Sequence, residues 1–201
     1  MVGRIVIVYH EPGDPRGVDM VEALASRIGQ SLGVEAIAVP MKRVEEGEHG
    51  FRKGDLVVSL LPARGGHLYT VVEAAREVGA LHFGPIPYNV IAQGLARRLS
   101  GCSRVSLVYW PAKRFVKEQR EDLEAISMEL SKLLGADVRL VEIDRVECSE
   151  CMAATSLFPG RVSKAISKCG PAKSVGYLFE AIEELLPAWV ESLYKSAQRV
   201  G

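Results

Sequence analysis

The sequence lacks the features that mark several common classes of protein. No apolar run reaches the ~18 residues that a membrane-spanning helix needs. Lys and Arg together number 25, as do Asp and Glu, so the basic excess typical of nucleic-acid-binding proteins is missing. Neither the Gly-x-Gly-x-x-Gly pattern nor the P-loop spacing occurs, which argues against nucleotide binding. We therefore expect a soluble, cytoplasmic protein with no nucleic-acid or membrane partner.

Asparagine and cysteine are also scarce. Asn89 is the only asparagine, which weakly favours a heat-adapted source, and in some such organisms cytosolic disulfides are common. The four cysteines include an isolated CxxC pair, Cys148 and Cys151, with Cys169 further along and Cys102 distant. Three or four thiolates could hold zinc or an iron–sulfur cluster, whereas disulfides and free thiols are the alternatives that this spacing leaves open. A thioredoxin-like role is disfavoured because this CxxC precedes a strand-like stretch instead of opening a helix.

Along the first half of the chain, segments with two different spacings of apolar residues alternate. Short continuous runs, typical of buried strands, cover residues 5–9, 34–39, 55–61 and 80–83. Helical spacing covers residues 18–32, 69–78 and 88–99. Strands that alternate with helices predict an α/β fold with a parallel sheet and right-handed crossovers.

The second half repeats this order at an offset of roughly 100 residues. Residues 105–109 match 5–9, residues 123–135 match 21–33, residues 138–141 match 36–39, and residues 156–159 match 59–62. The chain closes with a predicted helix over 175–194, interrupted near Pro187. We therefore predict an internal duplication: two similar α/β domains, 1–100 and 101–201, each a small parallel sheet flanked by helices, with a cleft between them.

Two histidines follow strands of the first predicted sheet. His10 comes directly after the first strand, and His67 follows the third strand after Gly65 and Gly66. Carboxyl ends of parallel strands share one edge of a sheet, where ligands bind, and neutral imidazole is a strong ligand for first-row divalent metals. The pair therefore predicts an open metal site, against the alternative of two surface histidines without a ligand.

The remaining histidines and the matching positions of the second half carry weaker signals. His82 lies within a short strand and is expected to be a core residue, and His49 lies in an acidic, solvated loop. All four histidines are in the first half, and Trp110 stands in the second half where His10 stands in the first. This asymmetry indicates one active half and one covering half.

Three segments of the first half together resemble a known family. Residues 8–17 (VYHEPGDPRG), 55–67 (DLVVSLLPARGGH) and 84–95 (GPIPYNVIAQGL) resemble, in order and spacing, the motifs of the class II tetrapyrrole chelatases, the sirohydrochlorin cobalto- and ferrochelatase group. In two places the sequence differs: the family's Gly-Ser-Arg after the first histidine is here Glu11-Pro12-Gly13, and the histidine of its Gly-x-His-Pro segment is here Ile86.

The resemblance implies insertion of a divalent metal (cobalt, iron or nickel) into a tetrapyrrole such as sirohydrochlorin. His10 and His67 would bind the metal and accept the pyrrole protons, with Glu11 as an assisting carboxylate. The forked guanidinium groups of Arg64 and Arg16 would bind substrate carboxylates, unless they are ordinary solvated charges, and Tyr9 would line the cleft, unless it packs in the core. The alternative is a non-catalytic paralogue that only binds metal or tetrapyrrole. Either a monomer or a homodimer is compatible with the sequence.

Overall fold

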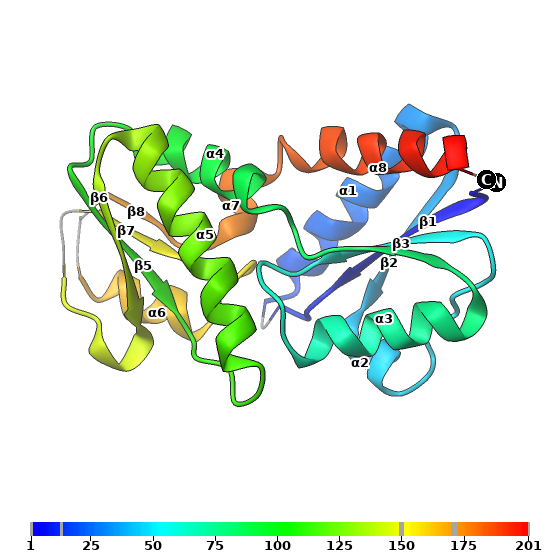
Figure 1. Ribbon diagram of the computed structural model, residues 1–201, viewed down its shortest axis with the longest axis horizontal. Coiled ribbons are helices and arrows are strands. Elements are labelled where there is room, and N and C mark those ends of the chain that lie inside the picture. The colour runs from blue at the N-terminus through cyan, green and yellow to red at the C-terminus, as the bar shows by residue number, and fades with distance from the viewer. Residues whose placement is uncertain (1, 13, 149–150, 170–172, 201) are drawn as a thin grey trace. The chain divides into compact units, whose positions relative to one another are not determined.

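The computed structural model describes residues 2–12, 14–148, 151–169 and 173–200. The chain divides into two packing units (Figure 1). Unit 1 comprises Met1–Pro85 and Leu185–Gly201, and unit 2 comprises Ile86–Glu184.

Unit 1 is built on a parallel four-stranded sheet with the order β2-β1-β3-β4. Its elements are β1 (Arg4–Tyr9), α1 (Arg16–Leu32), β2 (Glu35–Pro40), α2 (Met41–Glu45), β3 (Asp55–Leu60), α3 (Gly66–Val78), β4 (Leu81–Phe83) and α8 (Leu186–Val200). The central strands β1 and β3 are buried along their whole length, which explains their continuous apolar runs. Helices α2 and α3 lie on one side of the sheet, and α1 and α8 lie on the other (Figure 1).

The core of unit 1 follows the alternation of side chains along its strands. Val6 and Val8 of β1 pack in one cluster with Val44 of α2 and Val71 of α3. Ile5 and Ile7, which point to the opposite face, are also fully buried. Both faces of this sheet are therefore covered, as is usual for parallel sheets.

Unit 2 contains a second sheet with the equivalent order, β6-β5-β7-β8. Its elements are α4 (Tyr88–Arg98), β5 (Arg104–Tyr109), α5 (Val116–Leu134), β6 (Asp137–Glu142), the 3-10 turn η1 (Ile143–Arg145), β7 (Cys151–Ala154), α6 (Arg161–Ser167), β8 (Lys173–Val175) and α7 (Leu178–Ile182). Val162 and Ile166 of α6 pack on the sheet face that carries Val108 and Met152. The two sheets are parallel and flanked by helices, so the predicted fold class is confirmed, and their common strand order is what a duplication produces.

The packing units do not coincide with the two halves of the sequence. Helix α4 belongs to the first half in sequence but packs in unit 2 against α5 and α7, whereas α8, at the end of the chain, packs against α1 and β3 in unit 1. The contact between α4 and α7 is very close: a Cβ on Gly94 would lie 2.5 Å from the carbonyl oxygen of Ala181. The apolar faces of α4 and α8, and not the sequence repeat, therefore determine the two units.

Some predicted elements of the second half were wrong. The single helix expected over residues 175–194 is in fact the end of β8 followed by α7 and α8, and α6 was not predicted. The expected match of Ser59 with Ser156 is shifted, because strand register makes Ser59 equivalent to Ala154. The short strand β7 begins at Cys151, so the apolar run used for that match extends beyond the strand.

All four cysteines form disulfides, and both disulfides lie in unit 2. Cys102 is bonded to Cys151, and Cys148 is bonded to Cys169. The suggested iron–sulfur cluster or zinc site at Cys148, Cys151 and Cys169 is therefore wrong, because the sulfur atoms are joined in pairs and are not thiolates. None of the helices in the described part of the chain has the length and apolar character of a membrane span.

Candidate functional site

The two predicted histidines lie together in unit 1. His10 follows β1 directly, and His67 is the second residue of α3, which follows β3. Their ring centroids are 5.0 Å apart with an interplanar angle of 69°. Strand order reverses between β1 and β3, so the pair occupies the switch point at the carboxyl edge of the sheet, where open α/β sheets bind ligands. Both side chains are exposed to solvent.

Hydrogen bonds fix the proton on each imidazole. Nδ1 of His10 lies 3.2 Å from the backbone oxygen of Glu11, and Nδ1 of His67 lies 2.9 Å from Oε1 of Glu45. A carbonyl or carboxylate oxygen only accepts, so Nδ1 is the donor in both rings. In the neutral imidazole, Nε2 then carries a lone pair that can bind a metal ion.

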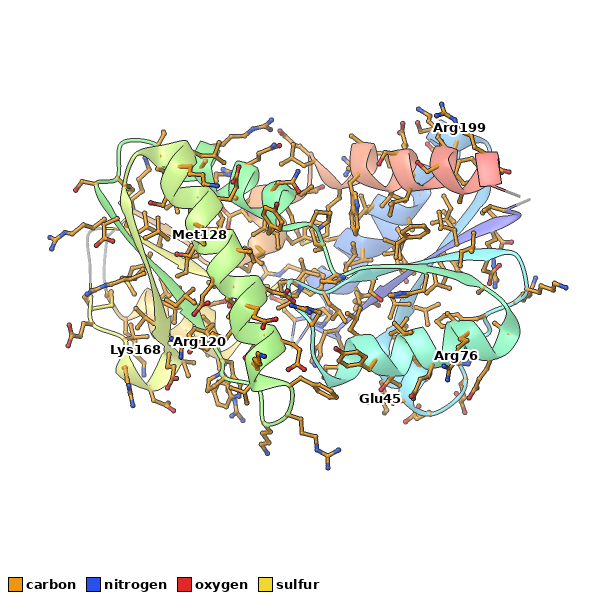
Figure 2. All side chains as sticks on the ribbon, viewed as in Figure 1. Glu45, Arg76, Arg120, Met128, Lys168 and Arg199 are labelled. Atoms are coloured by element: carbon orange, nitrogen blue, oxygen red, sulfur yellow. A yellow bond between two sulfur atoms is a disulfide. The ribbon has the colours of Figure 1, made fainter. Side chains whose placement is uncertain are left out.

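Glu45 is a site residue that the sequence reasoning missed. It is the last residue of α2, which follows β2, and its carboxylate reaches the ring of His67 from a third strand end of the same sheet (Glu45 is labelled in Figure 2). The side chains of His67 and Glu45 are 47% and 48% exposed, so this contact orients the ring and contributes little to stability. The available signal was an acidic residue shortly after the second strand, at the edge that carries both histidines.

Glu11, the predicted assisting carboxylate, contacts the beginning of helix α2. Its carboxylate accepts from the backbone N–H of Lys42 at 3.2 and 3.3 Å, at the beginning of α2. The first N–H groups of a helix have no partner within the helix, and an acidic side chain satisfies them. Glu11 thus joins the loop that carries His10 to the helix that ends at Glu45.

Neither predicted arginine contacts the histidine pair through any hydrogen bond in the described residues. Arg16 forms an ion pair with Asp14, with Nη2 and Oδ2 2.5 Å apart, and its side chain is 85% exposed. Hydrogen bonds from Arg16 lower the pKa of Asp14, whose carboxylate also accepts from the backbone N–H of Arg16 as α1 begins. Arg64 is half-buried in the loop between β3 and α3.

Burial and hydrogen bonds indicate structural roles for three further residues, Tyr9, His82 and His49. Tyr9 is only 3% exposed, and burial raises the pKa of its hydroxyl group, so it packs in the core. His82 places Nε2 2.9 Å from Oγ of Ser59, and burial lowers its pKa, as expected for a core histidine. Nδ1 of His49 accepts from the backbone N–H of Phe51, 3.0 Å away.

The donor set of the site is small. Among the described residues, no three His, Cys, Asp or Glu side chains come together as a metal-binding group. A surface cavity of about 370 Å³ lies in unit 2 beside Tyr109, Arg120 and Glu142, and its lining includes neither histidine (Arg120 is labelled in Figure 2). The exposed histidine pair therefore presents two imidazoles without a third side chain of these types, in the described part of the chain, placed to complete a metal-binding group.

Comparison with solved structures identifies the fold as that of the class II chelatases. The structure of CbiX, the terminal enzyme for biosynthesis of siroheme in denitrifying bacteria, matches with a TM-score of 0.66 and 17% identity, over 97% of this chain and 99% of that chain. SirB from Bacillus subtilis with Fe³⁺ matches with a TM-score of 0.66 and 13% identity, over 95% of both chains. The sirohydrochlorin chelatase SirB from Bacillus subtilis subspecies spizizenii, in complex with cobalt, matches with a TM-score of 0.58 and 15% identity, over 92% of this chain and 95% of that chain.

The resemblance predicted from three short motifs is thus confirmed at the level of the fold, over nearly the whole chain. No protein-family model and no curated protein sequence matches the chain.

Proposed function

We propose that this protein inserts a divalent metal ion (cobalt, iron or nickel) into a tetrapyrrole such as sirohydrochlorin. The observation that carries the proposal is the pair of exposed imidazoles 5.0 Å apart, each with Nδ1 facing an oxygen acceptor. A fold shared with SirB and CbiX supports it.

The pair suits a metal that has to be passed on. Nε2 of His10 and Nε2 of His67 would bind the ion, which is a substrate of the reaction. Two protein ligands leave several coordination positions for water and then for the pyrrole nitrogens, so the ion is held less firmly than in a closed structural site. Imidazole binds cobalt, nickel and iron alike, so the ligands alone do not select the metal.

Insertion also has to remove protons. Two N–H bonds of the macrocycle break as metal–nitrogen bonds form, and two protons leave. Once His10 and His67 have released the metal, each Nε2 can accept one of these protons. The Glu45 carboxylate, 2.9 Å from Nδ1 of His67, would keep Nδ1 as the donor and so leave Nε2 as the nitrogen that accepts the proton.

Substrate carboxylates require cationic partners. We assign this role to Arg64, which lies in the loop that leads to His67, because a guanidinium group matches a carboxylate with two parallel hydrogen bonds. Arg16, which pairs with Asp14 in the loop before α1, is the other candidate. A cytoplasmic location and a monomeric or homodimeric state stay predictions.

The first test is an insertion assay. Protein would be mixed anaerobically with sirohydrochlorin and Co²⁺, Ni²⁺ or Fe²⁺, and the change in absorbance compared with a reaction without protein. We expect acceleration by the wild type, and for His10→Ala and His67→Ala a rate lower by about 100-fold, the usual order for loss of a proton-transferring group. His49→Asn removes an imidazole outside the pair while keeping an acceptor for the Phe51 N–H, and it should retain the rate.

No acceleration with any of the three metals would refute the enzymatic proposal. Unchanged rates in both alanine variants would refute the site even if the wild type were active.

A metal carrier is the second candidate. Ile86 occupies the position where the resembled family has a further histidine, and it is only 2% exposed, which leaves the site with two imidazoles. A carrier would bind Co²⁺ or Ni²⁺ through His10 and His67 in equilibrium dialysis and would not accelerate insertion.

A further inference from the structure

Unit 2 has its own switch point, at the position equivalent to that of the histidine pair. Strand order in its sheet reverses between β5 and β7. Trp110 follows β5 as His10 follows β1, and Arg161 is the first residue of α6, the helix after β7. The duplication has therefore placed a different pair of side chains at the edge where such sheets bind ligands.

These two side chains form a cation–π pair. The guanidinium carbon of Arg161 lies 5.0 Å from the ring centroid of Trp110. Trp110 is 44% exposed, and Arg161 is also exposed. Within the described residues, neither the Arg161 guanidinium nor the Trp110 indole N–H has a hydrogen-bond or ion-pair partner, so the donors of both groups are available.

A third unused donor lies at the same edge. Ser156 follows β7 by two residues, and its Oγ is buried without a hydrogen-bond partner among the described residues. A buried hydroxyl group normally has a hydrogen-bond partner in the protein or in ordered water. The exposed guanidinium and the indole N–H are both donors, which a ligand rich in oxygen would match.

We propose that Trp110 and Arg161 form a binding site in unit 2 for a planar, conjugated polycarboxylate. The face of the indole that Arg161 does not cover would stack on the flat ring system of the ligand, and the guanidinium would bind a carboxylate through two parallel hydrogen bonds. This ligand class includes carboxylated tetrapyrroles, and the choice of a tetrapyrrole as the probe rests on the proposed function.

The test uses Trp110 as its own reporter. Trp110 and Trp189 are the two tryptophans, so Trp189→Phe leaves Trp110 as the sole emitter. The full chain carrying Trp189→Phe, His10→Ala and His67→Ala would be titrated with uroporphyrin in the absence of metal, with correction for absorption by the porphyrin. We expect saturable quenching that survives loss of both histidines.

Arginine variants separate a binding role from a structural one. Arg161→Gln should raise Kd about tenfold, the order expected for losing a charged hydrogen bond. Arg161→Lys keeps the charge without the fork and should give an intermediate Kd, and it covers the case in which Arg161→Gln folds poorly. Arg104→Gln is the matched control, because it removes one exposed arginine at the opposite end of β5.

Three outcomes would overturn the proposal. These are absence of saturable quenching, equal affinity for a cationic porphyrin of the same ring size, and an unchanged Kd in folded Arg161→Gln. Metal insertion without binding of this kind would refute the unit 2 site alone. Uroporphyrin binding without metal insertion would leave the unit 2 site standing and refute the proposed function.

Discussion

The first and third strands of each sheet are tied together at their amino ends in two chemically different ways. In unit 1, Arg4 of β1 and Asp55 of β3 form a buried ion pair, with Nε–Oδ1 and Nη2–Oδ2 distances of 3.1 and 2.6 Å. In unit 2, the residue equivalent to Arg4 is the exposed Arg104, and the same strand pair is tied by the Cys102–Cys151 disulfide. One strand order is thus compatible with an ionic tie or a covalent one, and the two should respond to different perturbations.

The carboxyl edges of the two sheets also carry chemically different side chains. At the switch point of unit 1 lie two imidazoles, His10 and His67, whereas at that of unit 2 lie an indole and a guanidinium, Trp110 and Arg161. Imidazole nitrogens bind metal ions, while an indole face and a guanidinium bind flat anionic groups. The two sheets have the same strand order, and the side chains at their carboxyl edges differ.

The largest expected effect is removal of the covalent tie. The Cys102–Cys151 disulfide closes a loop over a sequence separation of 49, so Cys102→Ser with Cys151→Ser should destabilise unit 2 by about 4 kcal/mol. Each unit contains one tryptophan, so Trp189→Phe and Trp110→Phe variants report the unfolding of unit 2 and unit 1 separately. If the unit 1 signal shifted as much as the unit 2 signal, the disulfide would not be a local tie.

Removal of the ionic tie should have the next largest effect. Arg4→Met leaves the Asp55 carboxylate buried and uncompensated, and should destabilise unit 1 by about 3 kcal/mol in denaturant unfolding followed by Trp189 emission. Arg104→Met, at the equivalent but exposed position, should change stability by less than about 0.5 kcal/mol. Equal effects of the two substitutions would contradict the contrast between the strand ties.

A smaller effect is expected at the carboxyl edge of unit 1. Glu45→Gln replaces the charged acceptor that orients His67 with a neutral one, and should weaken Co²⁺ binding about tenfold in equilibrium dialysis, as for other groups that orient metal ligands. Glu46→Gln is the matched control, because the neighbouring carboxylate contacts Lys42 and not His67. Equal loss of affinity in both variants would attribute the effect to general charge and not to orientation of the ring.

The smallest effect concerns pH. Burial lowers the pKa of His82, so the folded unit 1 resists protonation of this side chain and the unfolded chain does not. Its contribution to stability is therefore complete above the ordinary histidine pKa of about 6.5 and is lost as pH falls below it toward the lowered folded value. Ser174 occupies the equivalent position of β8 in unit 2, where this dependence is absent. His82→Gln should flatten the decline of the unit 1 signal below about pH 6.5 and leave the unit 2 signal unchanged.

Local patterns predicted much of this fold, but not its long-range contacts. The β-branched runs at Ile5–Tyr9 and Asp55–Leu60 gave the central strands, because a strand covered on both faces is apolar throughout. The positions of His10 and His67 followed from the rule that parallel strands end at one edge. Glu45 was missed because its contact with His67 spans 22 residues and leaves no periodic trace in the sequence.

The pairing of the cysteines is another long-range contact that the sequence did not predict. The CxxC spacing suggested that Cys148 and Cys151 act together, yet each has a distant partner, and sequence spacing carries no information on which sulfur atoms meet. Strand β8, with three residues, and helix α6, with seven, are too short for a clear periodicity. The sequence therefore predicted the longer helices and strands, which neighbouring residues determine, and not the contacts between distant residues.

The placement of α8 has a consequence for the order of events during synthesis. Unit 2 is one continuous stretch, Ile86–Glu184, whereas unit 1 needs the last residues of the chain, which pack on α1 and β3. Although most of unit 1 is translated first, it lacks this helix until the whole of unit 2 has been translated, and the side of its sheet that α8 covers stays open until then. The later unit can therefore complete its fold first, which reverses the usual order in which the amino-terminal part of a nascent chain settles before the rest.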